Sequence, residues 1–221
     1  GYTFKMMTPD ADGVAYFDPV DNTLEPGAQP RVIFLPSGSP ATPIVVATIA
    51  GASYPWGNRF ATDADYIYWN TATTVLRARK DGTTTTPELV ADGLASQFGD
   101  LLVVGSTLYV TRGFGTGTGF GLFRIPTAGA GACPQPAGPC SETLLSPYGG
   151  NELVAHTHAG STVLQSRSQI YWSSVESIRV YSCSLIVATP CTDGEAVTAP
   201  VDALTWYFGH TAFSGNTMLF M

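Results

Sequence analysis

The most informative stretch of the sequence is Asp63-Ala64-Asp65-Tyr66-Ile67-Tyr68-Trp69. Aspartate is favoured in tight turns because its side chain hydrogen-bonds the nearby backbone, and the aromatic and β-branched residues after it are typical of a strand. Two further short strands are expected at residues 75–79 and 88–91, separated by the turn Asp81-Gly82. Together with residues 59–61 before the first turn, they predict four antiparallel strands joined by hairpins.

The order of these elements recurs along the chain. The anchor residues Tyr16, Tyr68, Tyr109, Tyr171 and Leu219 each follow a turn, and their successive spacings are 52, 41, 62 and 48 residues. Expected first strands precede these turns, at residues 4–7, 59–61, 101–104, 162–165 and 211–213. A third and a fourth strand follow each of the first four anchors, at residues 32–35 and 44–47, 75–79 and 88–91, 121–125 and 142–145, and 177–181 and 195–198.

A four-stranded unit cannot bury both of its faces alone, whereas units stacked around an axis bury them against their neighbours. We therefore expect an all-β fold, a β-propeller within a single domain, with four four-stranded blades at about residues 1–51, 52–93, 94–149 and 150–200. Residues 201–221 supply only the first hairpin of a further blade, so we expect the chain to be part of a larger, six-bladed ring. A β-sandwich would also have many short strands, but not the same four-strand order four times.

Composition and charge argue against two classes of partner. Charged residues make up 12% of the 221 residues, about half of the usual share, and the net charge is −7. Lysine occurs only at Lys5 and Lys80 and there is no basic run, so we expect no nucleic-acid partner. The longest apolar stretch, residues 43–52, is about half of the length that spans a membrane, so we expect no membrane insertion.

The four cysteines fall in two close pairs, Cys133 with Cys140 and Cys183 with Cys191. Neither pair has the Cys-x-x-Cys spacing of zinc or redox sites. We expect two local disulfides, each clipping a hairpin, with four free buried thiols as the alternative. Because disulfides persist in oxidising compartments, we expect the protein to be secreted, periplasmic or on the cell surface.

Several of these features together resemble bacterial secreted propellers of the TolB-like and NHL-like kind. The resemblance is carried by the Asp-rich turn and aromatic strand at residues 63–69, by Leu76-Arg77, by Asp81-Gly82 and by residues 89–93. As a weak repeat it covers nearly the whole chain. It implies a platform that binds proteins or other ligands, with lyases and hydrolases as a minority of relatives. The cysteine pairs and the long loops between third and fourth strands depart from the simplest repeat of this kind.

The candidate ligand-binding residues lie in the segments between the fourth strand of one unit and the first strand of the next. In a propeller these segments cross one face of the ring, and loops on a rigid scaffold often carry function. Aromatic rings mixed with amides suit a protein or carbohydrate ligand, although packing between blades is an alternative role for the two tryptophans. The candidates are Trp56, Tyr148, Asn151, His156, His158, Trp206, Tyr207 and His210.

No motif identifies a catalytic residue. His156 and His158 are two residues apart, so on a strand they would share one side and could ligate one metal together with His210. Exposed loop histidines are the alternative interpretation. The Gly-rich run at residues 113–121 lacks the spacing of a nucleotide-binding loop, and we expect a hairpin loop there.

We expect no cofactor from the sequence, and calcium is the one alternative. The turn Asp10-Ala11-Asp12-Gly13, with Asp18, loosely resembles a calcium loop that lacks its later glutamate. Since Asp63 and Asp65 repeat the pattern, stabilisation of the turn itself is the competing interpretation.

The sequence therefore favours an extracellular, non-catalytic binding or assembly module over an enzyme. One alternative is a propeller lyase or hydrolase with a histidine-containing site at the central channel. Another is a structural subunit that assembles with itself or another chain by strand addition at an open blade edge.

Overall fold

The structure of the protein is a computed structural model. It describes residues 7–19, 27–39, 42–50, 60–71, 74–91, 98–112, 121–128, 143–146, 151–157, 168–174, 179–184, 195–196, 211–214 and 217–220. Every regular element in these ranges is a strand, and this part of the chain contains no helix that could cross a lipid bilayer. The all-β class predicted from the sequence is confirmed.

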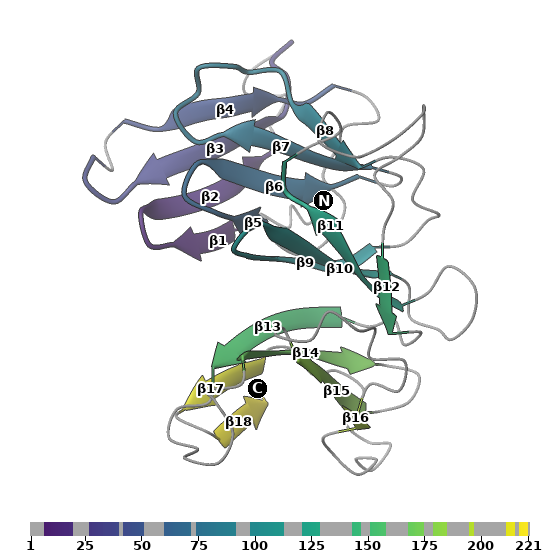
Figure 1. The fold of residues 1–221 in the computed structure, drawn as a ribbon. Coiled ribbons are helices and arrows are strands. Elements are labelled where there is room, and N and C mark those ends of the chain that lie inside the picture. The colour runs from purple at the N-terminus through teal and green to yellow at the C-terminus, as the bar shows by residue number, and fades with distance from the viewer. Residues whose placement is uncertain are drawn as a thin grey trace.

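The described strands form four antiparallel sheets of four strands and one of two (Figure 1). Sheet I contains β1 (Met7–Asp10), β2 (Gly13–Asp18), β3 (Arg31–Pro36) and β4 (Ile44–Thr48). Sheet II contains β5 (Ala61–Thr62), β6 (Tyr66–Asn70), β7 (Val75–Arg79) and β8 (Glu88–Ala91). Sheet III contains β9 (Phe98–Val104), β10 (Thr107–Arg112), β11 (Gly121–Pro126) and β12 (Thr143–Ser146). Sheet IV contains β13 (Asn151–Thr157), β14 (Ser168–Ser174), β15 (Arg179–Ser184) and β16 (Glu195–Ala196), and sheet V contains β17 (Thr211–Ser214) and β18 (Thr217–Phe220).

The first strand of sheet IV differs from the prediction. We expected it at residues 162–165, but the strand that pairs with β14 is β13, where Thr157 lies opposite Ser168. Residues 161–167 lie outside the described ranges. At the centre of β13 are Leu153 and Val154, and β-branched and other apolar residues favour strand formation even without a tight turn beside them.

The four anchor tyrosines all lie on the second strands of their sheets, but not in one register. Tyr68 and Tyr109 are each the third residue of their strand, and each lies opposite an arginine of the third strand. Tyr16 is the fourth residue of β2, as Tyr171 is of β14. The alignment of Tyr16 with Tyr68 is therefore wrong by one residue, which places the two rings on opposite faces of their sheets.

Two apolar layers fill the spaces on either side of sheet II. Towards sheet I, Trp69 packs edge-to-face on Phe60, with ring centroids 6.4 Å apart. Towards sheet III, the Tyr68 ring is fully buried. The first layer also contains Ala15, Phe17, Val32, Phe34, Val46, Ile67 and Leu76, and the second contains Val75, Val90, Leu101, Leu108, Val110 and Ile125.

The first strands of successive sheets lie beside one another. On β1, the Thr8 hydroxyl donates to the backbone oxygen of Phe60 (3.1 Å) and accepts from its N–H (2.9 Å), directly before β5. Further along the chain β5 contacts β9, β9 contacts β13 and β13 contacts β17. The described strands do not form a closed ring (Figure 1).

The turn between β7 and β8 packs closely on the edge of sheet I. Gly82 in this turn has a φ of +67°, and a Cβ at this position would lie 2.7 Å from Cγ2 of Ile44 on β4. The backbone N–H of Thr48 donates to the oxygen of Thr85 at 3.2 Å. Glycine is needed here for both its left-handed backbone and its lack of a side chain.

Candidate functional site

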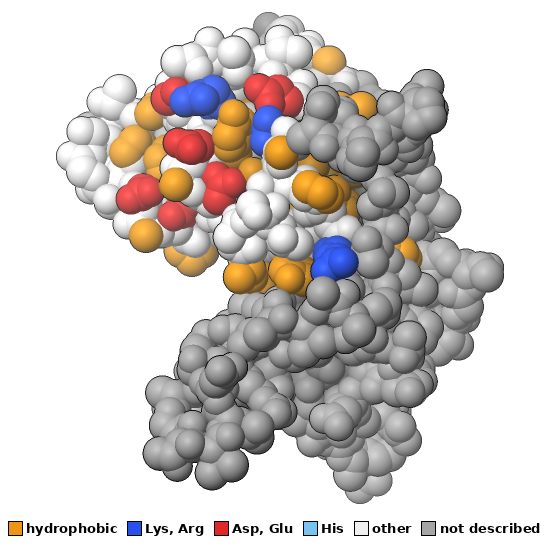
Figure 2. Space-filling view, viewed as in Figure 1, with side chains coloured by type: hydrophobic (Ala, Val, Ile, Leu, Met, Phe, Trp, Pro, Cys, Tyr) orange, Lys and Arg blue, Asp and Glu red, His pale blue; other side chains and the backbone are white. Residues whose placement is uncertain are grey.

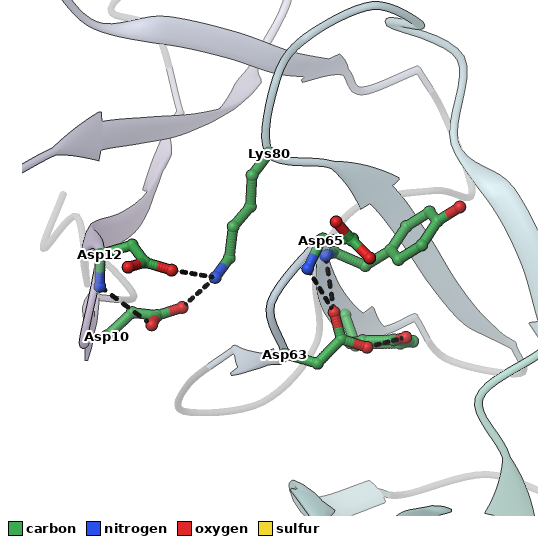
Figure 3. Close-up of polar contacts among 7 residues, drawn as sticks. Asp10, Asp12, Asp63, Asp65 and Lys80 are labelled. Carbon is green, nitrogen blue, oxygen red and sulfur yellow. Dashed lines mark hydrogen bonds and ion pairs between the residues drawn. The ribbon is translucent and has the colours of Figure 1, made fainter. Parts of the chain in front are cut away.

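Among the ion pairs of the described residues, the most buried one joins the turns of sheets I and II (Figure 3). Lys80 follows β7, and its Nζ donates to Oδ2 of Asp10 at the end of β1. The two side chains are only 8% and 10% exposed. The same Nζ lies 4.0 Å from Oδ2 of Asp12 and 5.3 Å from the ring centroid of Phe34.

Asp10 is held by more than one donor. The backbone N–H of Asp12 donates to its Oδ1 at 3.3 Å. Burial alone would raise the pKa of the Asp10 carboxyl, but hydrogen bonds from Lys80, Thr62 and Asp12 outweigh burial and lower the pKa below its ordinary value. The carboxylate is therefore charged at neutral pH, and the ion pair fixes the first turn of sheet I to sheet II.

Asp63 holds the corresponding turn of sheet II. Its Oδ1 accepts the backbone N–H groups of Asp65 (2.9 Å) and Tyr66 (2.7 Å), and its Oδ2 accepts the hydroxyl of Tyr68 at 2.6 Å (Figure 3). Burial and the hydrogen bond to Asp63 raise the pKa of Tyr68 far above its ordinary value. The phenol therefore stays protonated and serves as a fixed donor to the turn.

Arg77 on β7 links sheet II to sheet III. Its Nη1 donates to the backbone oxygen of Thr127, just after β11, and its Nε donates to Oε2 of Glu88 at 2.8 Å. The guanidinium carbon lies 4.1 Å from the ring centroid of Tyr66. Burial alone would lower the pKa of Arg77, but hydrogen bonds with Glu88 and Tyr68 raise it. Sheet II is thus tied by a cation to each of its neighbours.

The carboxylates of these clusters accept hydrogen bonds from other groups of the protein. Asp18 accepts a 2.7 Å hydrogen bond from Arg31, at the opposite end of β2 from the Asp10 turn. No group of three or more His, Cys, Asp or Glu that could hold a metal occurs in the described ranges. The hydrogen bonds of Asp63 support the turn-stabilising interpretation of the Asp-rich turns, and the calcium interpretation stays a prediction.

Charged side chains gather over the turns of sheets I and II, with hydrophobic ones between them (Figure 2). Arg79 and Asp81 form an exposed pair there, with a nitrogen-to-oxygen distance of 3.1 Å.

Two of the eight predicted ligand-binding residues lie in a described strand. Asn151 is opposite Ser173 and His156 is opposite Gln169. We expected both in a connecting segment; that placement is wrong, because residues 151–157 form the ladder with β14. Their side chains lie outside the described residues, as do Trp56, Tyr148, His158, Trp206, Tyr207 and His210. The predicted site, including its histidine-metal variant, stays a prediction.

The predicted disulfides also lie outside the described side chains. Only the backbone of Cys183 is described, in β15 opposite Ile170. Cys133, Cys140, Cys191 and the Gly-rich run at residues 113–120 are not among the described residues.

The sequence does not single out Lys80 and Arg77 as junction residues. Their partners across the sheet boundaries lie 70 and 50 residues away. One feature of the sequence could have indicated the junction at Lys80. Lys80 is one of only two lysines, and it lies in a turn of a chain whose other turns are rich in aspartate, the residue type with which a lysine forms ion pairs.

No protein-family model matches the chain. No curated protein matches it either. The resemblance to secreted propellers stays a prediction.

Proposed function

We propose that the five sheets are blades of a β-propeller and that the protein is an extracellular, non-catalytic module that binds a protein or a glycan through its loop face. The observation that carries this proposal is the series of contacts between first strands, from β1 beside Phe60 to β13 beside β17. In a propeller the first strand of each blade lies nearest to the axis, so successive first strands are neighbours. A sandwich of two sheets would give no such series.

The apolar layers on both sides of sheet II support the same proposal. Each layer joins the face of one sheet to the face of the next in chain order. Stacking of this kind gives a rigid scaffold, and rigid scaffolds carry ligands on their connecting loops. The two junction cations hold neighbouring sheets together through hydrogen bonds to protein atoms.

Binding is tested directly on arrays of glycans and of extracellular peptides. We expect a specific ligand class to be retained, and we expect Trp56→Ala and Trp206→Ala to lose it while the far-UV circular dichroism spectrum is unchanged. The control is Leu89→Ala, a residue that is 40% exposed and lies within β8 rather than in a proposed ligand-binding segment. The proposal would be contradicted if the protein bound to neither array, or if Leu89→Ala lost ligand binding to the same extent as the tryptophan variants.

Export to an oxidising compartment is part of this proposal. We expect peptide mapping without reductant to recover Cys133 joined to Cys140 and Cys183 joined to Cys191. Four alkylatable thiols in the protein purified from its native compartment would contradict an extracellular role.

Assembly through an open edge is a second candidate, favoured by the two-stranded sheet V. In the described residues β18 pairs only with β17, and an unpaired edge can accept a strand from another chain. Light scattering would show a concentration-dependent dimer or polymer if this edge is used. A monomer at all concentrations would exclude self-assembly.

A further inference from the structure

The contact between Lys80 and Asp10 brings an amine and a carboxyl carbon together. Lys80 follows β7 and reaches across to the end of β1, where its Nζ donates to Oδ2 of Asp10 (Figure 3). An amine nitrogen that contacts a carboxyl oxygen is also close to the carbon that carries this oxygen. Holding two reacting groups in contact replaces their encounter in solution and can supply much of the activation free energy.

Burial of the pair makes the neutral forms of both groups accessible. The Lys80 and Asp10 side chains are 8% and 10% exposed, and the buried ring of Phe34 lies 5.3 Å from Nζ. Transfer of the shared proton from Nζ to Oδ2 gives an amine and a carboxylic acid, which are cheaper to bury than two charges. Because hydrogen bonds lower the pKa of Asp10, this neutral pair is a minor state, and a reaction through it is slow.

Asp12 provides two further groups that such a reaction needs. Its backbone N–H donates to Oδ1 of Asp10 at 3.3 Å, the oxygen on which negative charge develops when an amine adds to the carboxyl carbon. Its carboxylate Oδ2 lies 4.0 Å from Nζ, and the side chain is 66% exposed, so a change of rotamer brings it within reach as a general base. The hydroxyl of Thr62 is a second donor to the Asp10 carboxyl.

We propose that Lys80 and Asp10 form an intramolecular amide bond after the chain has folded. The Lys80 amine adds to Cγ of protonated Asp10, and the Asp12 carboxylate accepts one proton from the nitrogen. Asp12 then returns this proton to the departing Oδ2 hydroxyl, which leaves as water. An ammonium and a carboxylate thus become an amide and one water molecule, Asp12 is regenerated, and no other reactant is needed. The ion pair described above is the reactant state.

The product is favoured by the position of the pair. The amide replaces two buried charges, whose desolvation is costly, with a neutral group. It also closes the chain across 70 residues, and a cross-link of this length reduces the conformational freedom of the unfolded chain. The bond joins sheet I to sheet II whatever ligand the protein binds, so this inference does not depend on the proposed function.

Intact-mass spectrometry of the reduced full-length protein tests the bond. We expect a species whose mass is lower than that of the sequence by one water molecule, and we expect its share to rise during incubation at neutral pH. Trypsin should fail to cleave after Lys80, and the peptide that contains Lys80 should be joined to the peptide that contains Asp10. The unchanged mass of the sequence after prolonged incubation would overturn the inference.

Two variants distinguish the amide from other losses of water. An Asp-Gly bond also loses water when it forms a succinimide, and the chain contains Asp12-Gly13 and Asp81-Gly82. Lys80→Arg keeps both of these sequences and the positive charge but removes the amine, so we expect its mass to equal that of its own sequence. The same loss of water in Lys80→Arg as in the wild type would overturn the inference.

The second variant, Asp12→Ser, keeps the backbone N–H that donates to Asp10 and removes only the carboxylate. We expect it to form the bond many times more slowly than the wild type. Formation at the wild-type rate would refute the role of Asp12 as the base.

Discussion

Removal of the Lys80 charge is the sharpest test of how the sheets are joined. Lys80→Met keeps an unbranched side chain beside Phe34 but leaves the Asp10 carboxylate without its cation. The substitution should not disturb either sheet internally, because Lys80 lies in a turn and its backbone N–H, which donates to Asp65, is retained.

The expected cost follows from the burial of the pair. Loss of one partner from a buried ion pair costs about 3–5 kcal/mol, because the other charge remains buried and unpaired. Asp10 keeps hydrogen bonds from Thr62 and from the backbone of Asp12, so we expect the lower end of this range, about 3 kcal/mol. The double variant Lys80→Met with Asp10→Asn removes both charges and should be more stable than Lys80→Met alone.

Urea unfolding measures the effect, and the midpoint should fall by about 1 M or more. The matched control is Arg79→Met, one residue away, whose ion pair with Asp81 is about 40% exposed on both sides and should contribute little. An unchanged midpoint in Lys80→Met, or an equal shift in Arg79→Met, would refute the idea that the buried pair joins the sheets.

Three further outcomes are expected. The folded-state pKa of Asp10 is lowered, so its stabilisation is complete above the unfolded-state pKa of about 3.9 and is lost as pH falls through the folded-state value; an acid titration of stability should show a smaller loss in Asp10→Asn than in the wild type. Gly82→Ala should destabilise by more than about 1 kcal/mol, because φ is +67° and the added Cβ meets β4, whereas Gly38→Ala, with open space around it, should leave the urea midpoint nearly unchanged. Tyr68→Phe should cost about 1–2 kcal/mol in the same assay, since it removes the hydroxyl donor to the first turn of sheet II, and no change would show that this hydrogen bond is not stabilising.

Most strands could be predicted from the sequence because their signals are local. The bounds of β7 and β8 agree with the predicted residues 75–79 and 88–91, where the turn residues Asp81 and Gly82 separate two runs of strand-forming residues. Register is less well determined, because one residue of offset changes the face on which a side chain lies. The alignment of Tyr16 with Tyr68 failed in this way.

Contacts between sheets could not be predicted. The pairing of Lys80 with Asp10 depends on how sheet II is placed on sheet I, and no pattern near either residue specifies that placement. The start of sheet IV was missed for a related reason: Thr157 and Ser168 pair across a long connection, so β13 has no tight turn to mark its end. The predicted binding residues were chosen by chain position relative to such turns, which is why Asn151 and His156 were placed in a loop.

The Lys80 junction also bears on the order of events when the chain folds. All strand pairs in the described ranges join consecutive strands, so a sheet can form as soon as its own residues leave the ribosome, and local topology of this kind folds quickly. The bond from Lys80 to Asp10 spans 70 residues and cannot form until the second sheet has docked on the first. Interactions made after the rate-limiting step act mainly on the unfolding rate. Without this bond the sheets should assemble about as fast and come apart sooner, so it would set the lifetime of the native state.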